Sequence, residues 1–176
     1  LEGNLTQSAT GSRSGVSSQT VGLGRIQGGS ARQASTNVLV RGSINQQQTE
    51  LAEQALSVGE VVGSSGTAAT RADVFGDLTQ TATAGRGGSG IDGQRIDIAS
   101  AKNNRGDVAT QAFVLANVQQ GGGSVGGISQ RVDLGSVQDA GAGTARTSAT
   151  VTGNISQQGS GALTGSQAVL VGSVGR

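Results

Sequence analysis

Aliphatic and polar residues alternate in short runs along most of the chain. Val21 and Leu23, Ile96 and Ile98, and Val132 and Leu134 are typical pairs, each separated by one small or polar residue. A period of two places one set of side chains on one face of a β-strand and the other set on the opposite face. The pattern therefore predicts short, half-buried strands, and no segment shows a convincing helical period.

The strands recur around a small residue that is followed, two positions later, by an aliphatic one. These anchors are Gly3, Gly24, Gly42, Gly59, Gly76, Ala99, Ala116, Gly135, Gly153 and Gly172, spaced 17 to 23 residues apart. Inward residues fall one and three positions before an anchor and two after it. This odd step predicts a corner, where glycine is suited to an unusual backbone conformation. The aliphatic residues after the anchors form the predicted core: Leu5, Ile26, Ile44, Val61, Leu78, Val118, Val137, Ile155 and Val174.

A second period is superimposed on the first. Alternate anchors begin a sharper motif that ends in glutamine, and these motifs recur every 34 to 40 residues. Either each unit of about 18–19 residues is one coil, or a pair of units of roughly 37 residues is one larger coil. The sequence leaves both arrangements open.

A single unit cannot bury its apolar side chains alone, but stacked copies of the unit can. We predict an all-β fold for residues 1–176, a single repeat domain. It is a β-solenoid of about ten stacked strand–turn–strand coils, about 45 Å long, with a narrow aliphatic core. Glutamines in register would form amide ladders along the stack. The ladder residues are Gln7, Gln46, Gln80, Gln120 and Gln157 in the motif strands, and Gln19, Gln54, Gln94, Gln130 and Gln167 in the strands after the loops, where Gln33 and Gln111 also fall.

The composition supports a structural role. The 176 residues include 32 Gly and two Phe, with no Pro, Cys, His, Met, Trp or Tyr. Without His, Cys or Tyr, most general bases, nucleophiles and metal sites are excluded. We therefore predict no catalytic residue, no cofactor, no metal and no enzymatic activity. The pairs Asp73 with Asp77 and Asp92 with Asp97 are expected to be solvated residues rather than acid–base partners.

The charge pattern argues against two classes of partner. Twelve basic and eleven acidic residues are interspersed, for a net charge of +1. No basic stripe is present for nucleic acid, and no apolar stretch is long enough to span a membrane. Scattered charges on exposed strand faces are expected to oppose sideways sheet association. The tripeptide Arg105-Gly106-Asp107 matches an integrin-binding motif, which we expect to be a coincidence.

The two ends of the chain carry no atypical capping unit. The first motif begins at Gly3, Asn4 and Leu5, and the last unit stops after Gly172 and Val174. Open strand edges are templates for another copy. We therefore expect self-association into a head-to-tail homopolymer through these residues.

The chain also begins at Leu1 without an initiator Met, as a processed secreted chain would, and lacks cysteine.

Strand–turn–strand repeats of this length, with Gln in both strands and Gly in the turns, resemble those of curli-type major fibre subunits. The resemblance implies an extracellular or bacterial cell-surface location, a functional amyloid of a biofilm, and secretion and nucleation factors as further partners. The chain is also similar, more weakly, to the β-helical stalk repeats of secreted bacterial adhesins.

These observations predict a structural subunit of a self-assembling extracellular fibre for biofilm matrix, adhesion or a surface filament. The first alternative is a stalk or passenger segment of a larger secreted adhesin. An ice-binding solenoid is a second alternative, for which only Thr79, Thr81 and Thr83 resemble the required array. A polysaccharide-processing β-helix enzyme is a third, although it would normally carry aromatic residues and clustered charge.

Overall fold

The computed structural model describes residues 1–10, 18–29, 32–49, 53–83, 91–123, 127–139, 141, 143–161 and 164–175. Within these ranges every regular element is a β-strand. Each strand pairs in parallel and in register with its equivalent about 37 residues away, so that Gln46 lies between Gln7 and Gln80. The predicted all-β solenoid is confirmed.

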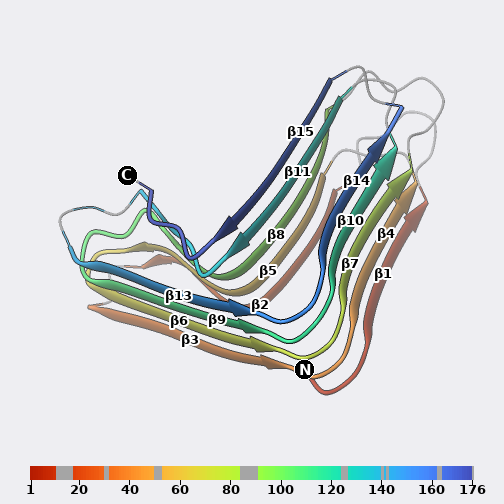
Figure 1. Cartoon of the computed structure of the whole chain (residues 1–176). Helices are drawn as coiled ribbons and strands as arrows, with labels where there is room; N and C mark the ends of the chain where they lie inside the picture. The colour runs from red at the N-terminus through yellow and green to blue at the C-terminus, as the bar shows by residue number, and fades with distance from the viewer. Residues whose placement is uncertain are drawn as a thin grey trace.

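Three parallel sheets, which we name A, B and C, make up the stack (Figure 1). Sheet A contains β1 (Leu5–Thr10), β4 (Ile44–Thr49), β7 (Leu78–Thr83), β10 (Val118–Gly123) and β14 (Ile155–Ser160). Sheet B contains β2 (Ser18–Gly29), β5 (Glu53–Ser64), β8 (Ile91–Lys102), β11 (Gly127–Leu134) and β15 (Thr164–Val171), with the short β12 (Val137–Gln138) also beside β8. Sheet C contains β3 (Gln33–Val40), β6 (Thr67–Val74), β9 (Val108–Val114) and β13 (Ala145–Val151).

The expected number of coils, about ten, is wrong. Sheet A has five described strands, sheet B has five rungs, because β11 and β12 both pair with β8, and sheet C has four strands, so the chain makes about four turns. One coil takes the larger unit of roughly 37 residues, because two successive short units form two different parts of the same coil. Five rungs at the usual strand spacing are only about 19 Å deep, less than half the length expected for ten coils.

Each coil is bent into two arms (Figure 1). Sheet A faces the first half of sheet B in one arm, and sheet C faces the continuation of sheet B in the other. The inner corner lies within the path of sheet B, at a column of residues with φ between +50° and +69°: Gly24, Gly59, Ala99, Gly135 and Gly172. The other five anchors lie at the outer corner, where sheet C leads into sheet A. The two kinds of anchor are therefore the two corners of one coil, which accounts for the change of alternation at each.

The core follows the columns of aliphatic side chains. Ile44, Leu78 and Val118 stack at the base of sheet A and are fully buried, as are Val61 and Val137 in the second arm. Leu5 and Ile155, in the end coils, and Ile26 are partly buried and pack against the core. Burying each such side chain contributes about 1.5–3 kcal/mol.

Val174 is a correction to the predicted core. Its side chain is 52% exposed, although it continues the inward column of Val137, with which it forms a bridge. No described strand covers it on the other side of the coil, because sheet C has one strand fewer than sheet B.

Gly106 provides a test of how closely the coils approach. A Cβ atom at Gly106 would lie 2.4 Å from the carbonyl oxygen of Gly66 in the preceding coil. We expect Gly106→Ala to lower the free energy of unfolding by about 1–3 kcal/mol, the usual cost of overpacking, as measured by urea denaturation. Gly121→Ala is the control, since a Cβ there meets no atom within 4 Å. Equal effects of the two substitutions would contradict the close approach.

Candidate functional site

The ten glutamines predicted to form the ladders lie in two columns that run the length of the stack. In the sheet A column, the side-chain Nε2 of each glutamine after Gln7 donates to Oε1 of the column glutamine one coil earlier. The sheet A distances are 3.1 Å for Gln46 to Gln7, 2.8 Å for Gln80 to Gln46, 2.9 Å for Gln120 to Gln80 and 2.8 Å for Gln157 to Gln120. In sheet B, they are 3.1 Å for Gln54 to Gln19, 2.9 Å for Gln94 to Gln54, 2.8 Å for Gln130 to Gln94 and 2.7 Å for Gln167 to Gln130.

Most of these amides also join the two sheets of the arm. Gln80 Nε2 donates a second hydrogen bond, of 3.1 Å, to the carbonyl oxygen of Arg95 on the facing strand β8. Gln94 in turn donates to the carbonyl oxygen of Gly121 in sheet A, also at 3.1 Å. One amide thus ties together three strands, each bond contributing a net of about 1 kcal/mol. Gln33 and Gln111 lie outside both columns and are exposed on sheet C.

Short polar side chains bridge the coils at their turns. Asn4 Oδ1 accepts a hydrogen bond of 3.0 Å from the backbone N–H of Ser43, and Asp77 Oδ1 accepts one of 2.9 Å from Asn117. Asn117 Oδ1 then accepts one of 3.1 Å from Asn154. These contacts satisfy backbone donors at corners that lie outside the strand ladders.

Asp107, the last residue of the integrin-like tripeptide, makes the same kind of contact. Its Oδ1 accepts a 2.8 Å hydrogen bond from the backbone N–H of Thr144 in the next coil, which lowers the pKa of Asp107. The carboxylate therefore has a structural role within the stack.

The lowered pKa of Asp107 predicts a pH dependence. A carboxylate whose pKa is depressed by folding adds stability above its unfolded pKa of about 4, and that stability is lost as the pH falls through the folded pKa. We expect Asp107→Ala to lower Tm slightly at pH 7 and to match the wild type near pH 2. Asp107→Asn keeps an acceptor oxygen but cannot ionise, so it should also fall slightly below the wild type at pH 7 and match it near pH 2. A difference between Asp107→Ala and the wild type that is independent of pH would contradict this account.

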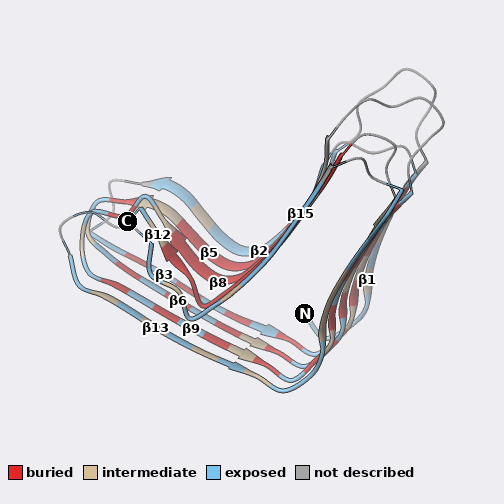
Figure 2. Cartoon of the chain, turned by 45° about the horizontal axis from the view of Figure 1, so that its top comes forward, coloured by how far each residue is buried: buried red, intermediate tan, exposed pale blue. Residues whose placement is uncertain are grey.

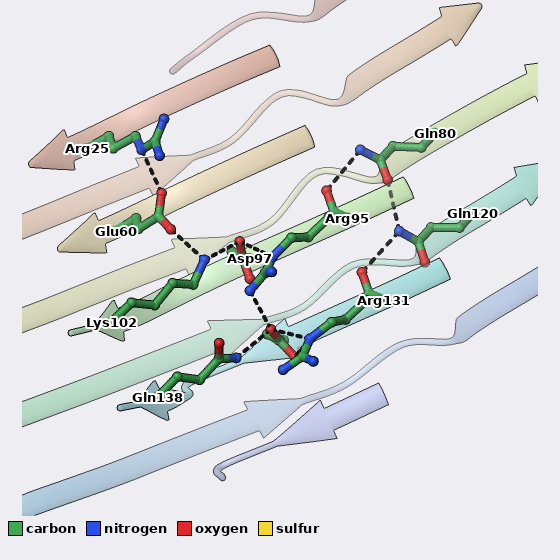
Figure 3. A network of polar contacts seen from close by, with 10 residues as sticks. Arg25, Glu60, Gln80, Arg95, Asp97, Lys102, Gln120, Arg131 and Gln138 are labelled. Atoms are coloured by element: carbon green, nitrogen blue, oxygen red, sulfur yellow. Dashed lines mark hydrogen bonds and ion pairs between the residues drawn. The ribbon is translucent and has the colours of Figure 1, made fainter. Parts of the chain in front are cut away.

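Charged side chains meet across the inside of the bend of sheet B (Figure 3). Lys102 Nζ lies 2.6 Å from Glu60 Oε1 and 2.7 Å from Asp97 Oδ2. Asp97 also pairs with Arg95 at 2.7 Å, and Arg95 extends to Asp133 of the next coil at 3.1 Å. We name this set the elbow network; it also includes Arg25, Arg131 and Gln138.

The elbow network corrects the expectation that charges lie on exposed strand faces. The side chains of Glu60, Asp97 and Asp133 are at most 3% exposed. They occupy the outward positions of sheet B, but the bend turns the two halves of that face toward each other, so the outward side chains become buried. In Figure 2, β5 and β8 are coloured as buried around the bend. In the sequence, the signal for this network is an acidic residue two positions before an inner-corner anchor, as at Asp97 and Asp133, or one position after it, as at Glu60.

The two central carboxylates of the elbow network differ in pKa. For Asp97, burial favours the neutral acid, but the hydrogen bond from Arg95 and the charge of Lys102 outweigh it and lower the pKa. For Asp133, burial prevails and, together with the neighbouring Asp97, raises the pKa despite the contact with Arg131. The network therefore links four coils by charge, and its members are largely occupied with one another.

The two ends of the stack leave strand edges unpaired within the described residues. Strands β1, β2 and β3 form one edge of the three sheets, and β14, β15 and β13 form the other. At the first edge Gly3 and Asn4 are exposed and Leu5 is partly buried. At the other, Gly172 donates to the carbonyl oxygen of Leu134, and Val174 is exposed. Both edges carry backbone donors and acceptors directed away from the stack.

None of the described residues forms a helix with the length and hydropathy needed to cross a membrane. The described residues also contain no cluster of three or more acidic side chains placed to hold a metal ion. No family model matches the chain, and neither the curated proteins nor the solved structures include a match to it.

Proposed function

We propose that this chain is a structural subunit of a self-assembling extracellular fibre, similar in kind to curli-type functional amyloid. The observation that carries the proposal is the repetition of one rung, with the same register and the same amide columns, up to both unpaired edges of the stack. A further copy placed at either edge would form the same backbone and glutamine hydrogen bonds that join neighbouring coils inside the molecule.

The geometry of the junction follows from the internal register. If β1 of a second copy adds to β14, Leu5 of that copy pairs with Ile155 and Gln7 with Gln157. These pairs extend the register that already joins β14 to β10. If β2 adds to β15, Gln19 comes to lie beside Gln167. Sheet C is one strand shorter than its neighbours, so we assign the contact to sheets A and B.

Apolar burial supports the same junction. Val169, Val171 and Val174 continue the inward columns of sheet B but are 42%, 48% and 52% exposed. In a second copy, Val21, Leu23 and Ile26 occupy the same columns and would cover them. Burial of valine side chains favours association by the same effect that stabilises the core.

The open rungs also support one alternative. In a stalk or passenger segment of a larger secreted adhesin, the next rungs would belong to the same chain instead of a second copy. Both arrangements use the same edges, and they differ in whether the isolated chain associates with itself.

Electron microscopy and size-exclusion chromatography of the purified chain test the proposal together. We expect unbranched filaments with a meridional fibre-diffraction spacing of about 4.8 Å. A chain that stays monomeric at high concentration would refute the fibre and favour the stalk.

A further inference from the structure

The side-chain amides give the stack a direction. In both columns every bond between two side-chain amides runs from Nε2 to Oε1 of the lower-numbered coil, as in Gln80 to Gln46 and Gln94 to Gln54, so each of these Oε1 atoms faces the higher-numbered coil. Eight successive side-chain bonds share this sense. A reversed amide in any rung would bring two donors or two acceptors together on one side.

The first rung ends in donors. Gln7 Nε2 and Gln19 Nε2 each donate to one carbonyl oxygen of the arm, at 3.4 Å to Thr20 and at 3.1 Å to Gln47. An amide nitrogen carries two hydrogens, and in the inner rungs the second one is donated to the preceding coil. At Gln7 and Gln19 none of the described residues accepts this second N–H, which is directed away from the stack.

The last rung ends in acceptors. Gln157 and Gln167 donate to Gln120 and Gln130 at 2.8 and 2.7 Å. Among the described residues, none donates to Oε1 of Gln157 or of Gln167. Their lone pairs therefore face the position that the next rung would occupy.

We propose that the stack has a donor end at Gln7 and Gln19 and an acceptor end at Gln157 and Gln167, and that these amides determine which ends can join. The inference rests on the proposed self-assembly and adds the groups that select its partner. Joining the donor end of one copy to the acceptor end of another completes both columns. Joining two donor ends would place N–H groups against N–H groups, and joining two acceptor ends would place oxygen lone pairs against each other. Water is excluded from this position, so these polar groups would be buried without hydrogen-bond partners, which is unfavourable.

Charge substitutions at the sheet A column provide a complementation test. In Gln7→Glu, the carboxylate still accepts from Gln46 but has no N–H for a neighbour. In Gln157→Lys, the ammonium still donates to Gln120 but has no lone pair to accept with. Each variant alone would bring like groups together at every junction, and we expect at least a tenfold loss of filament mass by electron microscopy and sedimentation.

A mixture of the two variants is expected to recover filaments. The ammonium at position 157 of one variant meets the carboxylate at position 7 of the other, and the remaining junctions have the native amides. The alternating copolymer is therefore the only product expected. Loss of structure in either variant would not produce recovery on mixing, and circular dichroism of each variant checks that it is folded.

Gln111→Glu and Gln119→Lys are the matched controls, because they introduce the same charges at exposed glutamines outside the columns. Both controls should form filaments as the wild type does, alone and together. If either control loses filaments as its column variant does, the effect belongs to added charge and the inference is wrong.

The outcomes separate the two proposals. Wild-type chain that forms no filaments would refute the proposed function, and the inference with it. Wild-type filaments together with unimpaired filaments of Gln7→Glu would refute the inference alone, as would a mixture that fails to recover.

A second measurement uses only one variant, in case Gln157→Lys does not fold. Wild-type seeds treated with Gln7→Glu should bind it at their donor end and then stop growing there, so labelled wild-type chain extends one end only. Undiminished growth at both ends would overturn the inference.

Discussion

Gln80→Glu is expected to lower the free energy of unfolding at pH 7 by about 4 kcal/mol or more. Gln80 is fully buried in the middle rung of the sheet A column. A carboxylate there keeps the bond accepted from Gln120 but loses those donated to Gln46 and to the carbonyl oxygen of Arg95. Its negative charge would then face two oxygen atoms without a proton between them. Urea denaturation followed by circular dichroism measures the loss.

The same substitution predicts an unusual dependence on pH. Burial should raise the pKa of the introduced carboxyl group above its unfolded value of about 4.3. Because the folded pKa is raised, the deficit relative to the wild type shrinks as the pH falls through it. The protonated acid also regains an O–H donor for Gln46. Gln119→Glu, exposed on the neighbouring strand β10, should have little effect at any pH. A deficit for Gln80→Glu that is constant from pH 3 to 8 would contradict the amide column.

Lys102→Met is expected to cost about 3 kcal/mol. Lys102 is the cation between Glu60 and Asp97, whose side chains are 2% and 3% exposed. Removing it leaves two buried carboxylates in place, each with one arginine partner, Arg25 for Glu60 and Arg95 for Asp97. Charge removal without a compensating change is costly when the partner charge stays buried. Equilibrium unfolding in urea at pH 7 measures the effect.

A double-mutant cycle and a surface control identify the cause. Adding Glu60→Gln to Lys102→Met should recover part of the loss, because one of the stranded charges is neutralised. Arg71→Met removes the cation of an exposed pair with Asp73 and should cost less than about 1 kcal/mol. Equal costs for Lys102→Met and Arg71→Met would show that the elbow network contributes no more than a surface pair.

The sequence predicted the rungs but not how they close into a coil. Alternation around Gly42 and Gly59 identifies the strands and the corners, since both depend only on neighbouring residues. Both kinds of corner need a small residue followed by an aliphatic one, so the local pattern does not distinguish them. The difference lies in the backbone, with φ of +69° at Gly59 within sheet B and no positive φ at Gly42. The only cue was the glutamine that follows every second anchor, as Gln46 follows Gly42.

The elbow network could not be predicted from alternation, because its charges do not share one column. Arg25 pairs with Glu60 directly across the ladder, but Lys102 reaches Asp97, five residues before it, across the bend. Alternation correctly places these side chains on the outward face of sheet B. Whether that face is exposed depends on the angle between the two arms, which is a property of the whole coil.

The bent coil has a mechanical consequence for any long stack. Two thin arms joined at an angle form the cross-section of an angle beam, which resists bending in two directions, whereas a single flat ribbon of strands bends easily across its thin dimension. A tensile load along the axis also pulls all the interstrand hydrogen bonds of one coil at the same time, so that none fails separately. The salt bridges at the elbow lie along the line where the arms meet and oppose any opening of the angle. The rigidity of the stack thus comes from the bent cross-section of its coils, because the aliphatic core is narrow.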